Sequence, residues 1–206
     1  MKMDVSEFDR VAREVFAPAY VAIARQILDE TGVARGKALD LGAGGGYLSL
    51  ALARITTLDI VLLDQLPEMQ KIAQRNIVDA GLEKRLRTLM ADVHEIPLEG
   101  GSVDLVFSRG SVFFWKDQVR AFREIYRVLA PGGRTFIGGG FGSVALKKQI
   151  DEKMVARQKD WLHMTRARMN ATTMTHFRAV LEKAGVPHEI RQVEAGFGIM
   201  IKREDA

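Results

Sequence analysis

The chain alternates between segments with helical hydrophobic spacing and short runs that are apolar almost throughout. From Asp4 to Thr31, apolar residues recur every three or four positions, which is typical of amphipathic helices. Pro18 suits the first turn of a second helix within this segment, and Gly32 can end that helix. The N-terminal part is therefore predicted to be a pair of helices.

Five short runs with strand character follow, and helical segments separate most of them. The run over residues 58–64 is nearly continuous and apolar, as in a parallel strand that is covered on both faces. Strands that alternate with helices imply right-handed crossovers and a doubly wound parallel sheet. The predicted strands are 37–41, 58–64, 86–91, 103–108 and 134–138, and the predicted helices are 47–54, 67–80 and 117–129, the last ending at the breaker Pro131-Gly132-Gly133.

The C-terminal tail breaks this alternation. Residues 188–193 and 197–202 are two β-like runs, joined only by Glu194-Ala195-Gly196. So short a link allows a hairpin but no crossover helix, so one of these strands must run antiparallel. The expected fold is an α/β domain with a doubly wound, mostly parallel, seven-stranded sheet and an antiparallel C-terminal hairpin strand.

Composition narrows the class of protein. A chain of 206 residues, 47% hydrophobic and 27% charged, is typical of one globular domain. The absence of cysteine excludes disulfides, thiolate metal sites and cysteine nucleophiles, and it fits a reducing cytoplasm. The sequence has neither a signal peptide nor a run near the ~18 apolar residues of a membrane span. The net charge of +4 does not by itself indicate nucleic-acid binding.

The most distinctive motif, Asp40-Leu41-Gly42-Ala43-Gly44-Gly45-Gly46, joins the first predicted strand to the next helix. Glycine allows positive φ angles and lets the backbone lie against a ligand. Ligands of doubly wound sheets bind at the carboxyl ends of the strands. A dinucleotide-binding turn needs a glycine where Tyr47 stands, and a P-loop needs a lysine that this motif lacks. The motif therefore departs from both of these phosphate-binding patterns.

Acidic residues also close the next two predicted strands, at Asp64 and Asp92. A carboxylate at position 64 can accept both hydroxyls of a ribose, and one at position 92 can accept from an adenine amino group. Each acid alone is more often a helix cap or a surface charge. Together with Asp40, in order and in register, they favour a cofactor that contains adenosine.

The pattern Asp-x-Gly-x-Gly-x-Gly resembles the first motif of class I S-adenosylmethionine-dependent methyltransferases. Residues 61–69 resemble the second strand and ribose-binding acid of this family, and residues 92–106 resemble its adenine-side loop and fourth strand. Residues 124–133 resemble the helix and turn before the fifth strand. The similarity spans roughly residues 36–140, and it implies a Rossmann-like fold with S-adenosylmethionine as the cofactor.

The resemblance also implies the residues that contact the cofactor. Asp64 is expected to hold the ribose hydroxyls, while Asp92 and the backbone amide of Val93 hold the adenine ring. Asp40 either orders the glycine loop or meets the ammonium group of the cofactor. The expected cofactor-binding residues are Asp40, Gly42, Ala43, Gly44, Gly46, Asp64, Gln65, Met69, Asp92, Val93 and Ser108.

The residues that carry the chemistry are less clear. Alignment can supply much of the catalysis of an in-line methyl displacement, so the lack of an obvious general base does not exclude an enzyme. Arg109 is a candidate for binding a substrate carboxylate or phosphate, or for an ordinary salt bridge. His94 is a candidate for catalysis or for hydrogen bonding within its loop. Tyr20 and Trp115 are further candidates on the substrate side. The spacing of acids and histidines predicts no metal site.

Two later segments have alternative interpretations. The glycines over residues 138–142 provide either a tight turn or close approach of a ligand. Residues 147–172 contain seven basic and three acidic side chains, and Trp161 and His163 also lie in this segment. They form either a basic lid that attracts an anionic acceptor or RNA, or a solvated helix face.

These features together predict a cytoplasmic S-adenosylmethionine-dependent methyltransferase that acts on a small molecule, because the chain carries no appended domain for a macromolecule. Nucleic acid and membrane partners are not expected. The alternatives are an RNA methyltransferase that uses the basic lid, and a module that binds the cofactor without transferring methyl groups. The expected parts of this single domain are a helical cover (1–32), a cofactor-binding core (36–140), a helical lid (143–175) and a terminal hairpin (187–203).

Overall fold

One seven-stranded sheet, in the order β3-β2-β1-β4-β5-β7-β6, forms the centre of the protein. The computed structural model describes residues 4–204. Strands β1 to β5 pair in parallel, whereas β7 is antiparallel to both of its neighbours. The predicted fold class is confirmed. The strands are β1 (Lys37–Leu41), β2 (Asp59–Asp64), β3 (Leu86–Met90), β4 (Val103–Arg109), β5 (Leu129–Gly140), β6 (Glu189–Val193) and β7 (Gly196–Met200).

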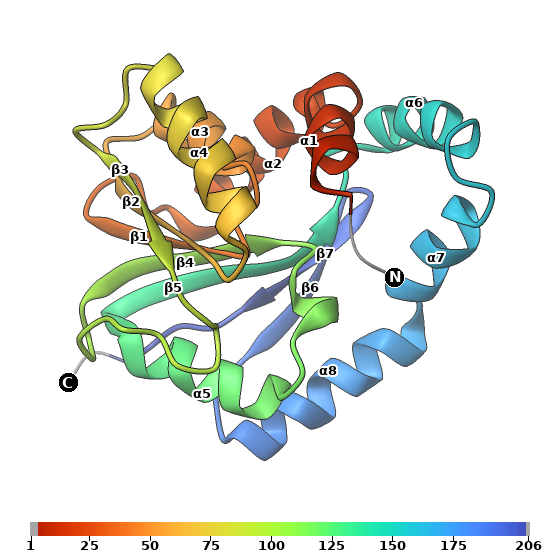
Figure 1. Ribbon diagram of the computed structural model, residues 1–206. Coiled ribbons are helices and arrows are strands. Elements are labelled where there is room, and N and C mark those ends of the chain that lie inside the picture. The colour runs from red at the N-terminus through yellow and green to blue at the C-terminus, as the bar shows by residue number, and fades with distance from the viewer. Residues whose placement is uncertain (1–3, 205–206) are drawn as a thin grey trace.

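Helices cover both faces of this sheet (Figure 1). Helices α2, α3 and α4 lie on one face and α5 and α8 on the other, while α6 and α7 lie outside the sheet at the right of the view. No helix in residues 4–204 is long and apolar enough to cross a membrane. The helices are α1 (Val5–Glu14), α2 (Ala17–Thr31), α3 (Tyr47–Ala53), α4 (Pro67–Asp79), α5 (Gln118–Val128), α6 (Val144–Val155), α7 (Trp161–Arg168) and α8 (Ala171–Ala184).

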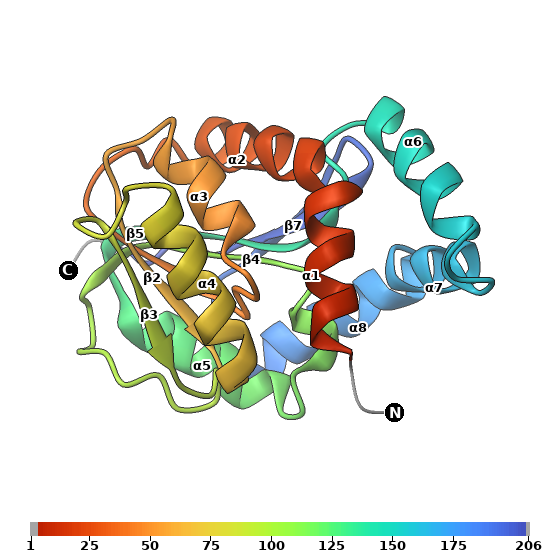
Figure 2. The ribbon, with the colours of Figure 1, turned by 45° about the horizontal axis from the view of Figure 1, so that its top comes forward.

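The strand order changes direction between β1 and β4. From β1 the chain adds β2 and β3 on one side, and β4 then pairs with the other side of β1. In open α/β sheets, the carboxyl ends of strands at such a switch point are where ligands bind. Helix α1 stands beside these strand ends, between α4 and α7 (Figure 2). The fold therefore brings the N-terminal helix to the glycine motif.

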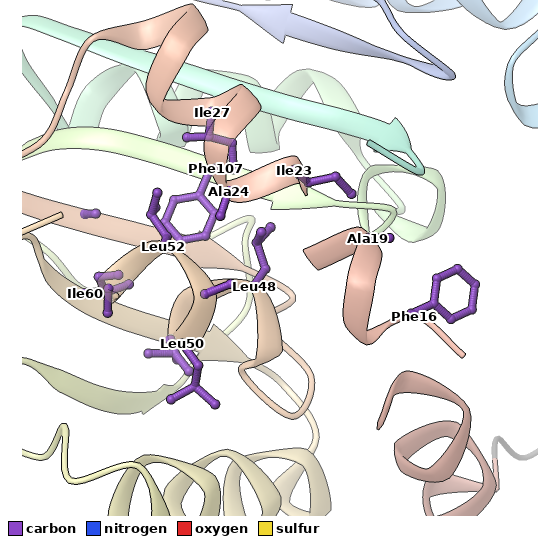
Figure 3. Close-up of a cluster of buried hydrophobic side chains, with 14 of the residues drawn as sticks. Phe16, Ala19, Ile23, Ala24, Ile27, Leu48, Leu50, Leu52, Ile60 and Phe107 are labelled. Atoms are coloured by element: carbon purple, nitrogen blue, oxygen red, sulfur yellow. The ribbon is translucent and has the colours of Figure 1, made fainter. Parts of the chain in front are cut away.

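A hydrophobic core fills the space between the sheet and each helical layer. On the α2 and α3 side, Phe107 of β4 is fully buried. Its ring lies among Ala24 and Ile27 of α2 and Leu52 of α3 (Figure 3). This packing fixes the direction of β4, and with it the position of the residues that follow Phe107 at the carboxyl end of the strand.

Most element boundaries agree with the sequence-based prediction to within one or two residues, and two differ by more. Strand β5 already begins at Leu129, because this residue pairs with Val103 across a register shift before the main part of the β4–β5 ladder. Helix α8 continues to Ala184, well past the expected lid, and the Arg123 side chain on α5 donates to the Ala184 carbonyl over 3.2 Å. Most of α8 is thus part of the sheet's covering layer.

The glycines at the end of β5 are explained by strand packing. A Cβ atom on Gly138 would overlap the backbone carbonyl of Phe197, and one on Gly196 would overlap the carbonyl of Gly139. Bare backbone on both strands therefore allows β5 and β7 to pair closely. This strand packing is neither of the two interpretations of residues 138–142, although Gly142, with a φ of +81°, does form a turn after the strand.

Replacing Phe107 with alanine tests the packing that fixes β4. Removal of a fully buried phenylalanine leaves a cavity, so Phe107→Ala is expected to lower the free energy of unfolding by about 3–5 kcal/mol in urea denaturation. Val21→Ala on α2 is the control, because Val21 is 48% exposed, and it should change stability by less than ~0.5 kcal/mol. Equal effects of the two variants would contradict the described core.

Candidate cofactor site

The glycine loop is held tightly at the ends of β1 and β2. The backbone amides of Gly42 and Ala43 donate to the Leu63 carbonyl over 2.8 and 3.0 Å. Gly46 is the N-cap of α3 and has a φ of +78°. A Cβ atom on Gly46 would lie 2.6 Å from a methyl group of Leu62. Glycine is therefore required at position 46 both for the turn and for the close packing of the loop on β2.

Asp64, the last residue of β2, organises this loop. One of its carboxylate oxygens accepts from the Gly44 amide over 2.8 Å, and the other accepts from the Leu66 amide over 3.0 Å. Each carboxylate oxygen can accept a further hydrogen bond. Asp64 can thus hold the glycine loop and still accept from a ligand hydroxyl, while the neighbouring Gln65 is exposed.

Asp40 is a buried acid directly beneath the loop. Its side chain accepts from the Ser49 hydroxyl of α3 over 2.7 Å. Burial raises the pKa of Asp40 to about 7, a rise that the Ser49 hydrogen bond opposes and the nearby Asp64 charge adds to. A cation bound beside Asp40 would favour its charged form, so the position suits the ammonium group of an amino acid.

A serine pair ties the end of β4 to the end of β1. The hydroxyls of Ser108 and Ser111 lie 2.6 Å apart, and both lie within hydrogen-bond distance of the Leu41 carbonyl, at 2.7 and 2.9 Å. The sequence does not single out Ser111. The structure shows how close Ser111 lies to the glycine loop, because a Cβ atom on Gly42 would overlap the Ser111 side chain.

Asp92 and His94 form a hydrogen-bonded loop after β3. The exposed Asp92 accepts from the backbone amide and the ring Nδ1 of His94, and the His94 amide is the main cause that lowers the pKa of Asp92. The ring Nε2 of His94 accepts from the Asp117 amide over 3.0 Å. Both ring nitrogens are engaged, which favours the loop-bonding interpretation of His94 over catalysis. Val93 is buried in the core.

A methionine other than the predicted one lies at the exposed edge of the site. Met69 of α4 is only 2% exposed and packs in the core. Met90, which ends β3 and is in register with Asp64, is 64% exposed. The sequence does not single out Met90, because its position inside a strand gives no sign of exposure. An exposed apolar side chain beside Asp64 suits the face of an adenine ring.

The three substrate-side candidates divide between two places. Arg109 and Tyr20 come together on the α2 side, where the Arg109 guanidinium carbon lies 5.5 Å from the centre of the Tyr20 ring. Trp115 instead packs on Phe122 of α5, and its indole nitrogen donates to the Ser111 hydroxyl over 3.2 Å. Trp115 therefore supports the β4 loop from the opposite face of the sheet.

Two of the seven basic side chains of the expected lid have acidic partners within residues 4–204. Lys147 pairs with Asp151, and Arg157 pairs with Glu14 of α1 over 2.8 Å.

A groove of about 470 Å³ lies between α6, α7, α8 and the hairpin. Residues 4–204 contain no cluster of acids and histidines that could hold a metal ion. The residues that line the groove are Lys147, Thr165, Arg166, Met169, Asn170, Met174, Arg178, Ile190, Gln192, Ala195, Gly196 and Phe197.

Comparison with known proteins identifies the family. Residues 39–137 match the family model described as a methyltransferase domain. The structure superposes with a TM-score of 0.95 on a provisionally assigned S-adenosyl-L-methionine-dependent methyltransferase from Methanococcus maripaludis, with 40% identity over 98% of this chain and 93% of that one. The chain belongs to the class I S-adenosylmethionine-dependent methyltransferase family. Its cofactor is therefore S-adenosylmethionine.

Curated relatives match this chain over shorter stretches. An uncharacterized methyltransferase of Mycobacterium tuberculosis is 40% identical over 98 residues, which are 48% of this chain and 37% of the relative. A ubiquinone/menaquinone biosynthesis C-methyltransferase of Idiomarina loihiensis is 32% identical over 116 residues, which are 55% of this chain and 46% of the relative. The matched part is thus less than half of either relative.

The residues of the candidate site fit this cofactor chemically. Asp64 retains acceptor capacity for the ribose hydroxyls, and the amide of Val93 has no acceptor within residues 4–204. Asp40 is a buried acid without a cationic partner in the described part of the chain. Acceptors for hydroxyls, a free backbone donor and a buried acid match the ribose, adenine and ammonium groups of S-adenosylmethionine.

The raised pKa of Asp40 predicts a pH-dependent stability. A carboxyl group whose pKa is higher in the folded protein stabilises the fold fully below its unfolded pKa, near 4, and this stabilisation is lost as the pH rises to about 7. Asp40→Asn removes the titration. The free energy of unfolding of this variant, relative to wild type, should therefore increase by roughly 2–3 kcal/mol from about pH 5 to pH 8 in urea denaturation.

The exposed Asp79 of α4 supplies the matched control for this experiment. Asp79→Asn should show the same difference from wild type at each pH. A difference for Asp40→Asn that does not change with pH would mean that Asp40 is charged in the folded protein throughout this range.

Proposed function

We propose that this protein is an enzyme that transfers a methyl group from S-adenosylmethionine to a small-molecule acceptor. The observation that carries the proposal is the geometry at the switch point, where Asp64 holds the glycine loop open to a ligand beside the buried Asp40. Family membership supports the cofactor. A cytoplasmic location is part of the proposal, because the lack of cysteine fits a reducing compartment.

Within this proposal, each strand end contributes one part of the binding site. Asp64 accepts hydrogen bonds from the ribose hydroxyls, and Asp40 binds the ammonium group. Asp92 accepts from the adenine amino group, and the Val93 amide donates to the adenine ring. Bound S-adenosylmethionine supplies a methyl group on a sulfonium, which is already a good leaving group. The remaining proposed cofactor contacts are Gly42, Ala43, Gly44 and Gly46 along the loop, Gln65 and Met90 near the adenine, and Ser108 near the methionine part. Met69 is not among them, because it is buried in the core.

The chain's own contribution to catalysis is positioning. Holding the two reactants in line can lower the activation free energy of methyl transfer by several kcal/mol, without a general base. His94 is not assigned a catalytic role, because both of its ring nitrogens are engaged by the loop. The helical cover formed by α1 and α2 closes this edge of the sheet, with Tyr47 of α3 donating to Asp9 of α1.

A small acceptor is supported by three observations. One relative is named for a quinone substrate class, which consists of small molecules. The groove beside the lid, at about 470 Å³, has the size of a small-molecule site. Lys147 and Arg157 are neutralised by acids, which leaves the lid less basic than its composition suggests.

Turnover tests the proposed activity directly. The protein would be incubated with S-adenosylmethionine labelled on the methyl group and with extracts of small metabolites. The proposal predicts formation of S-adenosylhomocysteine together with a labelled product of low mass. Bound cofactor without turnover in any extract would instead support the non-catalytic module. Binding of single-stranded RNA that persists at ~150 mM salt, with label in the RNA, would support the RNA methyltransferase.

Asp64→Ala tests the assigned cofactor contacts. The variant loses the acceptor of the ribose hydroxyls and releases the Gly44 amide, so S-adenosylhomocysteine is expected to bind at least ~10-fold more weakly by calorimetry. The control is Asp59→Ala, since Asp59 is an exposed acid at the other end of the same strand. An unchanged dissociation constant for Asp64→Ala would show that the assigned site is wrong.

A further inference from the structure

Arg109 is a cation whose terminal nitrogens have no partner in the part of the chain that the structure describes. It ends β4, and its Nε donates to the Gly140 carbonyl over 3.0 Å. Its two terminal nitrogens make no hydrogen bond or ion pair within residues 4–204, although part of the side chain remains accessible. Burial lowers the pKa of Arg109. An arginine that is largely removed from water normally has its donors satisfied.

Other partly buried arginines of this chain show what a structural role looks like. Arg85 donates to the carbonyls of Ala53, Thr56 and Leu58, and thereby joins the end of α3 to β2. Arg203 likewise donates to the Leu129 carbonyl over 2.6 Å and to two carbonyls just before it. In both, a terminal nitrogen is used to bind backbone oxygens. Arg109 differs, because only its Nε is used in this way.

An aromatic cage holds the Arg109 guanidinium in place. Its central carbon lies 4.6 Å from the centre of the Phe16 ring, 5.5 Å from Tyr20 and 5.8 Å from Phe141. Cation–π contacts offset part of the lost hydration and fix the plane of the group. They leave its terminal N–H donors unused, since these point within the plane of the guanidinium.

Tyr20 adds a second unused donor at the same place. Its ring stacks on Tyr47, with 5.7 Å between ring centres, and burial raises its pKa, so the hydroxyl stays protonated. The hydroxyl has no hydrogen-bond partner in the described chain. It is not fully enclosed either, because no completely buried side-chain N or O atom of residues 4–204 lacks a partner. The donors of Arg109 and Tyr20 therefore face accessible space.

We propose that Arg109 and Tyr20 form a carboxylate-binding subsite at the carboxyl end of β4. A planar guanidinium matches a carboxylate through two parallel N–H···O bonds, and the Tyr20 hydroxyl can donate a third. The subsite lies on the same face of the sheet as Asp40, because Asp40 is in register with Phe107, two residues before Arg109. This inference rests on the proposed function, since it assumes that the β1 and β4 ends hold the reactants.

Two carboxylates can reach this place: that of the cofactor's own amino acid group and one carried by the methyl acceptor. The two sources are separated with S-adenosylhomocysteine, which carries the carboxylate, and 5′-methylthioadenosine, which lacks the amino acid part. If the cofactor is the source, Arg109→Gln should weaken S-adenosylhomocysteine binding at least ~10-fold and change 5′-methylthioadenosine binding less than ~2-fold.

If the acceptor is the source, the variant should bind both nucleosides as wild type does. In that case acetate, added to the complex with S-adenosylhomocysteine, should shift the Nε–H NMR signal of Arg109 in a saturable way, and neutral acetamide should not. Tyr20→Phe keeps the stacking on Tyr47 and removes one donor. This variant should weaken the binding of the carboxylate that occupies the subsite by ~2- to 5-fold.

Stability measurements separate ligand binding from a structural role. Arg109→Met removes a poorly satisfied charge, so its melting temperature should stay within ~2 °C of wild type or rise. Arg85→Met is the matched control. It leaves three carbonyls without their donor and should lower the melting temperature by about 5 °C or more.

The inference is wrong if Arg109→Met melts as far below wild type as Arg85→Met does. It is also wrong if wild type binds S-adenosylhomocysteine, but neither the Arg109→Gln affinities nor the acetate titration shows an effect. The melting comparison needs no cofactor, and the binding result requires that wild type binds S-adenosylhomocysteine. Both results are therefore distinct from failure of the proposed methyl transfer.

Discussion

The candidate site depends on the hydrogen bond between the Asp64 carboxylate and the Gly44 amide. This bond joins the end of β2 to a loop made mostly of glycine, which has few side chains of its own to stabilise its conformation. Together with the bonds from Gly42 and Ala43 to Leu63, it fixes the backbone against which a ligand must lie. The rest of the sheet supports this arrangement, because the strand order changes direction between β1 and β4 and the packing of Phe107 sets the direction of β4.

Much of the fold could be predicted because its signals are local. Apolar runs, helical spacing and the short link before the last strand depend only on neighbouring residues, and the structure confirms the parallel sheet with its reversed hairpin strand. The early start of β5 could not be predicted, because it follows from the pairing of Leu129 with Val103, far away in the sequence. The length of α8 is similarly set by its packing on α5.

The site was predictable in type but less so in its contacts. Acids and glycines at strand ends are visible in the sequence, whereas burial and exposure are not. The sequence thus points to Met69, which is in the core, and passes over the exposed Met90. It leaves His94 between catalysis and loop hydrogen bonding, and only the structure shows that both of its ring nitrogens bond within the loops. The sequence leaves Arg109 between a salt bridge and a ligand contact, and only the structure shows that no acid in the described chain pairs with it.

In the proposed site, the glycine loop and Asp64 bind the adenosine part of S-adenosylmethionine. A crystal structure of the protein with S-adenosylhomocysteine tests this claim most directly. We predict that both ribose hydroxyls lie within hydrogen-bond distance of the Asp64 carboxylate, with the sulfur atom facing the end of β4. A nucleoside bound elsewhere, or a ribose that makes no contact with Asp64, would contradict the account.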